Sequence, residues 1–172
     1  MTIKTKHFGS LIYTKEDGAD FKVASLELNN KRSQCTLMIF DGFDEQEIVR
    51  AIEIIDNLES LDAISRNEIS SSYDSENQTV NDFINEHFND YGEDIAKDIY
   101  AKLNVSEQDD LAFIENLELG SVSVSKRADD LNSISTTLDY NVLWSDGISF
   151  TDQILAVTFD QEMKFIYLSH ES

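Results

Sequence analysis

Residues 33–58, SQCTLMIFDGFDEQEIVRAIEIIDNL, contain the point at which the periodicity of the chain changes. Residues 33–41 are apolar on both faces of an extended chain, which is typical of a central or covered β-strand. From residue 44 the apolar side chains recur every three to four positions, which is the period of an amphipathic helix. The stretch therefore predicts a covered strand followed closely by a helix over residues 44–58.

Strands and helices occur in separate blocks around this transition. Strand patterns before the helix cover residues 7–13, 20–28 and 33–41. Helical patterns then cover residues 44–58, 60–71, 79–103 and a last segment that opens at Ser106. Four more strands are expected over residues 117–125, 133–144, 153–159 and 164–170. Because strands and helices do not alternate, we predict an α+β fold with a mainly antiparallel sheet and a central block of acidic helices on one face.

The bulk composition fits one folded unit. A chain of 172 residues with 41% hydrophobic residues can form a proper core. No linker or internal repeat divides it, so residues 1–172 are expected to form a single domain. The lone Cys35 fits a reducing compartment, and no signal peptide or apolar stretch of membrane length is visible. We therefore expect a cytoplasmic protein without a membrane-bound part.

The negative charge is concentrated in the predicted helices. The chain has a net charge of −21, of which residues 1–40 contribute +2, residues 41–120 contribute −18 and residues 121–172 contribute −5. A surface of this sign repels phosphate, so direct binding to nucleic acid or to anionic lipid is not expected. Basic proteins are the natural partners of such a chain.

The longest helical pattern carries acids at an unbroken four-residue spacing. They are Asp82, Glu86, Asp90, Asp94 and Asp98. On a continuous helix they would form one acidic ladder, and each like-charged pair would cost about 0.2–0.5 kcal/mol. The ladder is either a docking strip for a basic partner or the solvated face of an acidic chain. Gly92 interrupts the pattern and indicates a kink or a division into two helices.

No motif of a catalytic or cofactor site occurs. The chain has no GxSxG, SxxK, Walker or GxGxxG pattern, and its three histidines lack the spacing of a zinc site. His87 is expected at the boundary of the core, and Cys35 inside it as a small apolar side chain. We predict no catalytic residue, metal site or cofactor, and a protein that is not an enzyme. With 34 Asp and Glu residues, the sequence neither supports nor excludes a pair of catalytic carboxylates.

Three stretches resemble a bacterial family of uncharacterised proteins, one of the numbered domains of unknown function. They are EQEIVRAIEIIDNLESLDAISRNEI at residues 45–69, TVNDFINEHF at residues 79–88 and the closing hairpin ILAVTFDQEMKFIYLSHES at residues 154–172. The resemblance implies a small acidic α+β protein and supplies no activity or functional residues. In style such a protein is similar to bacterial immunity proteins, which neutralise toxins by binding them.

Three functions stay open on these observations. The first is a protein-binding module of the immunity or inhibitor type, which presents an acidic helical face to a basic partner and binds less tightly as salt rises. The second is an enzyme that uses carboxylates with a divalent metal. The third is a self-associating structural protein, and the sequence does not determine the oligomeric state.

Overall fold

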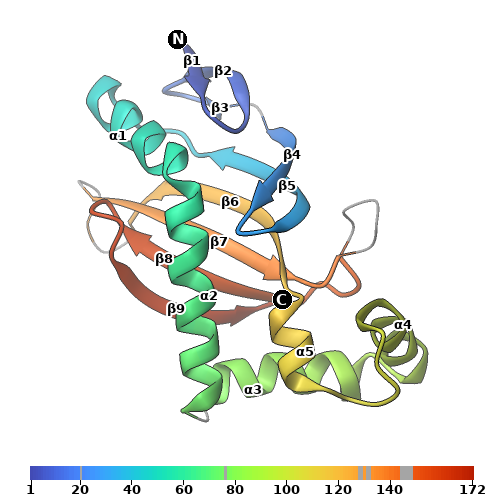
Figure 1. The fold of residues 1–172 in the computed structure, drawn as a ribbon. Helices are drawn as coiled ribbons and strands as arrows, with labels where there is room; N and C mark the ends of the chain where they lie inside the picture. The colour runs from blue at the N-terminus through green and yellow to red at the C-terminus, as the bar shows by residue number, and fades with distance from the viewer. Residues whose placement is uncertain (20, 76, 128–129, 131–132, 144–148) are drawn as a thin grey trace.

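The structure, a computed structural model, describes residues 1–172 except 20, 76, 128–129, 131–132 and 144–148, and it has the predicted α+β architecture (Figure 1). A small sheet contains β1 (Thr2–Thr5), β2 (Gly9–Thr14) and β3 (Gly18–Ala19). A larger sheet contains β4 (Lys22–Leu28), β5 (Lys31–Ile39), β6 (Glu118–Lys126), β7 (Ile134–Asn141), β8 (Ile154–Asp160) and β9 (Phe165–Glu171). The helices are α1 (Glu45–Asp56), α2 (Leu58–Asp74), α3 (Gln78–Asn85), η1 (Glu86–Asp90), α4 (Glu93–Leu103) and α5 (Asp110–Glu115).

The larger sheet is mainly antiparallel, as predicted. Its strands lie in chain order from β4 to β9, and only the β5–β6 pair is parallel. This pair is parallel because the whole helical block lies between the two strands and returns the chain to the same end of the sheet. The prediction was incomplete at the N-terminus, since β1 and β3 are too short to show an alternating pattern.

Gly18 fixes the place where the small sheet meets the large one. Its φ is +73°, and a Cβ atom there would lie 2.4 Å from the carbonyl oxygen of Ile39 at the end of β5. Only glycine permits both this backbone conformation and this close approach. The residue therefore joins β3 to the edge of the core without a steric clash.

Helix α1 begins where the sequence predicts it, at a capping box. Asp44 Oδ1 accepts hydrogen bonds from the backbone N–H groups of Gln46 and Glu47, and the Glu47 carboxylate accepts one from the backbone N–H of Asp44. The chain turns at Asn57 and continues as α2 up to Asp74, three residues further than expected. The two helices therefore form one nearly continuous layer.

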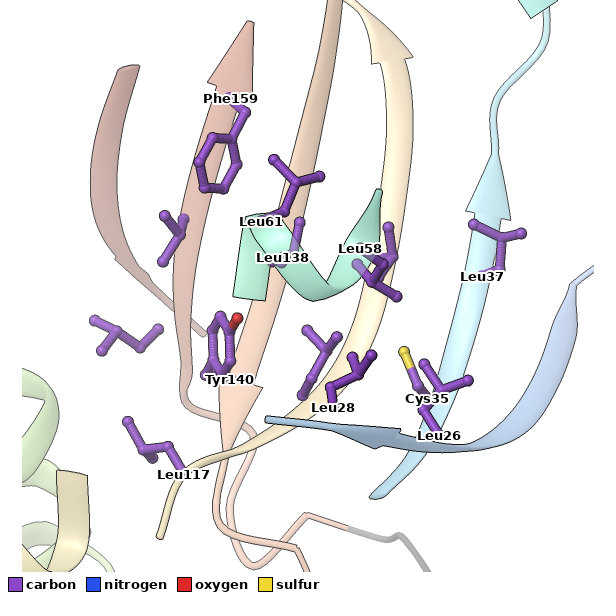
Figure 2. Packing of buried hydrophobic residues seen from close by; sticks show 14 of the residues in the cluster. Leu26, Leu28, Cys35, Leu37, Leu58, Leu61, Leu117, Leu138, Tyr140 and Phe159 are labelled. Carbon is purple, nitrogen blue, oxygen red and sulfur yellow. The ribbon is translucent and has the colours of Figure 1, made fainter. Parts of the chain in front are cut away.

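Helix α2 crosses the sheet and supplies the centre of the core (Figure 1). Its buried side chains Leu58 and Leu61 pack beside Leu138 of β7 and Phe159 of β8 (Figure 2). Complete burial of each such side chain is worth about 1.5–3 kcal/mol. Cys35 of β5 also has no exposed surface, and burial raises the pKa of its thiol, which agrees with its prediction as a core side chain.

The expected helix over residues 79–103 is divided into three pieces. Helix α3 is capped by Asn77, whose Oδ1 accepts a hydrogen bond from the backbone N–H of Thr79. A π-helical turn follows as η1, and Gly92 then adopts a φ of +87° before α4 starts. The i→i+5 hydrogen bonds of a π-turn rotate the following side chains around the helix axis, and the backbone at Gly92 is no longer helical. Helix α4 therefore runs in a new direction (Figure 1).

The remaining boundaries differ from the prediction in small ways. Helix α5 is capped by Asp109, which accepts from the backbone N–H of Ala112, so the helix starts one turn after Ser106. Strand β7 ends at Asn141, and Trp144 lies outside the described residues. Among the described helices, none has the length and apolar character needed to span a bilayer.

Candidate functional site: the acidic arm and its groove

The single ladder that requires a continuous helix does not form. Asp82 is exposed on α3, Glu86 begins η1 and is partly exposed, and Asp94 and Asp98 are exposed on α4. The side chain of Asp90 lies outside the described set. The break at η1 and Gly92 leaves two short acidic pairs on different helices, because four-residue spacing aligns side chains only along one α-helix.

The segment from α3 to α5, residues 78–115, is here called the acidic arm. In Figure 1 it lies near the lower end of α2, at the bottom of the molecule. Its α4 buries Ala96 and Ile99 in the core and stacks the ring of Tyr100 on that of Phe88, with the ring centroids 5.5 Å apart. On its outer side the carboxylates of Glu93 and Asp94 are 92% and 100% exposed. The ammonium group of Lys97 lies 3.5 Å from the Glu93 carboxylate and 3.6 Å from that of Asp94, and surface ion pairs of this kind add little to the stability of the fold.

An open groove of about 770 Å³ lies at the junction of α4 and α5. The groove is lined by Tyr73, Asn104, Val105, Ser106, Glu107, Gln108, Asp109, Asp110 and Leu111. Asp110 accepts hydrogen bonds from the side chains of Gln108 at 2.8 Å and Tyr73 at 3.4 Å. Leu111 stays 57% exposed. The groove therefore combines three carboxylates with an accessible apolar surface, which no spacing in the sequence indicated.

The electrostatic field in this groove is negative. Burial, followed by the negative charges of Asp110, Asp109 and Asp74, raises the pKa of the Tyr73 hydroxyl. Among the described residues that line the groove, none is Lys or Arg. A cation entering the groove would therefore meet carboxylates that no lining base neutralises.

The basic residues of the stretch 41–120, which carries most of the negative charge, form ion pairs outside the groove. Residues 41–120 contain four of them: Arg50, Arg66, Lys97 and Lys102. Their carboxylate partners are Glu53 for Arg50, Asp62 for Arg66, Glu93 and Asp94 for Lys97, and Glu118 for Lys102. These pairs neutralise charge beside the sheet and on α4, and they leave the carboxylates of the groove facing solvent.

A buried histidine network lies behind the arm, and the expectation for His87 was wrong. His87 has no exposed surface. Its Nδ1–H donates to the carbonyl oxygen of Phe83 at 2.8 Å, and the Thr151 hydroxyl donates to its Nε2 at 2.8 Å. Asn141 Oδ1 lies 3.0 Å from the same Nε2. Burial lowers the pKa of His87 and outweighs the contacts with Phe83 and Asn141, which favour the protonated ring.

The network continues toward the surface through β8 and β9. His170 Nε2 lies 2.6 Å from Gln153 Oε1 and 3.8 Å from a carboxylate oxygen of Glu86. The Gln153 side-chain amide donates to the Tyr91 hydroxyl at 2.8 Å, and that hydroxyl donates to Asp152. These contacts tie η1 to the sheet. No local sequence pattern indicated them, because the partners lie 17 to 84 positions apart along the chain.

A second buried cluster joins α2 to the sheet. Asp62 has no exposed surface, and its carboxylate accepts hydrogen bonds from Tyr140 at 2.8 Å, Asn29 at 2.7 Å and Arg66 at 3.0 Å. Burial and then the charge of Asp62 raise the pKa of the Tyr140 hydroxyl well above its ordinary value. Arg66 also lies 5.4 Å from the centre of the Tyr140 ring. Asp62 and Tyr140 have no exposed surface, while Arg66 and Asn29 reach them from the surface, so the cluster joins α2 to β7 at the side of the core.

Within the described part of the chain, no three His, Cys, Asp or Glu side chains are grouped so that they could hold a metal ion. No family model, no curated protein and no solved structure matches the chain. Neither a sequence relative nor a structural relative therefore indicates an activity. The groove of the acidic arm is open to solvent, unlike the His87 network and the Asp62 cluster, whose central side chains are buried.

Proposed function

We propose that the protein is a non-enzymatic binding module whose acidic arm receives a basic segment of a partner protein. The observation that carries the proposal is the groove at residues 104–111, where Glu107, Asp109 and Asp110 surround an open space without a lining Lys or Arg among the described residues. An immunity-type inhibitor of a basic toxin in a bacterial cytoplasm is the sharpest form of this function.

The groove has the chemistry that a Lys or Arg side chain requires. The aliphatic stem of such a side chain would lie along Val105 and Leu111, while its charged end would approach the carboxylates. The exposed acids of α4, among them Asp94 and Asp98, would attract the partner over a longer range. Association should therefore slow as salt is added.

The proposal is tested by removing charge from the arm at constant shape. One variant carries Asp98→Asn, Glu107→Gln and Asp110→Asn, and leaves Asp109 to cap α5. The matched control carries Glu16→Gln, Glu27→Gln and Glu162→Gln, three exposed acids outside the arm. Both variants lose the same net charge. Circular dichroism establishes that both are folded.

Each protein is used as bait in a lysate of the organism that produces it. We expect a basic protein that the native chain and the control retain, and that the arm variant and added salt release. Equal retention by all three baits would overturn the proposal. The absence of any basic protein from the native bait would overturn it as well.

Self-association is the second candidate, and a specific observation favours it. Phe21 directly precedes β4, Val23 lies in it and Phe40 directly follows β5, and the three are 72%, 67% and 50% exposed; β4 is an edge strand of the larger sheet. An exposed apolar edge is a common site of pairing between chains. Light scattering distinguishes the two candidates: a dimer that Phe21→Ser and Val23→Ser dissociate supports self-association, and a monomer excludes it.

A further inference from the structure

The sheet face opposite α2 carries a pocket that the proposed function does not use. The pocket has a volume of about 380 Å³ and crosses the four strands from β6 to β9. Its described lining consists of Ser125, Lys126, Arg127, Ser135, Thr137, Thr158, Ile166 and Tyr167. Because Val124 and Leu138 face the helical core, strand alternation turns their neighbours Ser125 and Thr137 toward the opposite face.

Hydroxyl groups are aligned across the strands of this pocket. The register places Thr137 beside Thr158, and Thr158 beside Tyr167. The hydroxyl oxygens of Thr137 and Thr158 lie 3.2 Å apart, and those of Ser125 and Ser135 lie 3.3 Å apart. Within each pair one hydroxyl donates a hydrogen bond to the other. The second hydroxyl proton and the remaining oxygen lone pairs can therefore bond to a ligand. The pocket can therefore donate and accept hydrogen bonds at neighbouring points.

The charge of the pocket differs from that of the rest of the molecule. Among the described residues that line it, none is Asp or Glu, although the chain contains 34 of them. The ammonium group of Lys126 lies 2.8 Å from a carboxylate oxygen of Glu47 on α1, so its charge is balanced on the helical side. Arg127 is the other base of the lining, but a chain with a net charge of −21 repels anions, so a polar ligand without net charge suits this lining better than an ion does.

Tyr167 gives the pocket a flat apolar border. It lies on the edge strand β9 and remains 51% exposed, and Ile166 lines the pocket beside it. Aromatic faces provide large contact areas for ligands whose edges carry polar groups. A sugar ring has this character, because its C–H face packs on an aromatic ring while its hydroxyls exchange hydrogen bonds with the protein. A pocket of a few hundred Å³ also falls in the size range of small-ligand sites.

We propose that this pocket binds a neutral saccharide, with one sugar ring stacked on Tyr167 and its hydroxyls bonded to those of Ser135 and Thr137. The site lies on the sheet, away from the groove of the acidic arm, and does not depend on the function proposed above.

The test is a titration of ¹⁵N-labelled protein with maltotriose, cellotriose and chitotriose, followed by amide chemical shifts. We expect saturable shifts with at least one probe, confined to the amides of the residues that line the pocket. Concentrations up to about 10 mM detect dissociation constants in the millimolar range. The absence of saturable shifts at these amides with all three probes would overturn the proposal.

Variants separate a built site from weak general association. We expect Tyr167→Ala to weaken binding about tenfold or more, and Tyr167→Phe to retain it, because the ring face makes the contact. Thr137→Val keeps the shape of the side chain, removes its hydroxyl and should weaken binding by about three- to tenfold. Tyr73→Ala, in the groove of the acidic arm, is the matched control. Equal binding by Tyr167→Ala and Tyr73→Ala would overturn the site.

Discussion

The helices α1 and α2 carry acids as densely as the acidic arm does, yet the two regions use them differently. In the first region several carboxylates hold distant segments of the chain in place. Glu47 pairs with Lys126 of β6, and Asp56 accepts a hydrogen bond from the backbone N–H of Lys6. Asp62 is buried with three hydrogen-bond donors. These acids are structural, because each has a partner that folding brings to it.

In the acidic arm the carboxylates have few such partners. Asp82, Asp98 and Glu107 are exposed, and the pairs of Lys97 with Glu93 and Asp94 are long and solvated. The difference teaches that the number of acids in a segment says little about their role. What distinguishes the two regions is whether a base or a backbone N–H reaches each carboxylate.

The strongest way to break this comparison is to remove one buried acid and one exposed acid. Asp62→Ala should lower the free energy of unfolding by roughly 3–5 kcal/mol, because it removes a fully buried carboxylate and leaves its three hydrogen-bond donors, Arg66 among them, without their acceptor. Asp82→Ala on α3 should change it by less than about 0.5 kcal/mol. Urea denaturation of both variants measures the difference, and similar losses would show that the two regions are not distinct.

The buried histidine network gives a pH dependence with a defined sign. Burial holds the pKa of His87 below its ordinary value of 6.5. Just below pH 6.5 this imidazole is therefore protonated in the unfolded chain and still neutral in the folded chain. Stability is therefore complete above about pH 6.5 and falls as the pH drops below that value, by at most about 1.4 kcal/mol per pH unit for this group.

His87→Gln isolates the contribution of this imidazole. The variant should be less stable than the native protein at pH 7.5, and it should lose less stability between pH 7 and pH 5.5. Denaturation curves at several pH values give both quantities. A variant whose stability falls as steeply as that of the native protein would contradict the assignment of His87 as a neutral buried ring.

The smallest effect concerns salt. Two like-charged pairs survive in the arm at four-residue spacing, Asp82 with Glu86 and Asp94 with Asp98, and together they cost roughly 0.4–1 kcal/mol at low salt. Screening of this repulsion should raise the melting temperature by about 2–4 °C at most between low and moderate salt. Asp82→Asn with Asp98→Asn should reduce the rise, whereas Glu16→Gln with Glu27→Gln should not. Calorimetric scans at two salt concentrations measure it.

The sequence predicted most of the fold correctly because its signals are local. The three- to four-residue period that starts at residue 44 marks α1, and the alternation of Ile134, Leu138 and Tyr140 marks the covered face of β7. The acidic ladder shows where this reasoning stops. Its five acids have the correct spacing for one helix, but the π-turn and Gly92 divide that helix. The contacts of His87 with Asn141 of β7 and with Thr151 before β8 accompany the division.

The sequence by itself determined the α+β class, the position of the first helix and the concentration of negative charge in residues 41–120. These properties depend on periodicity, caps and composition, which act over a few residues. The tertiary structure alone decided which acids are structural and which stay free, where the groove of the arm lies, and that Asp62 meets Tyr140 across 78 positions of the chain. Contacts of this kind depend on the path of the whole backbone, and no local pattern specifies them.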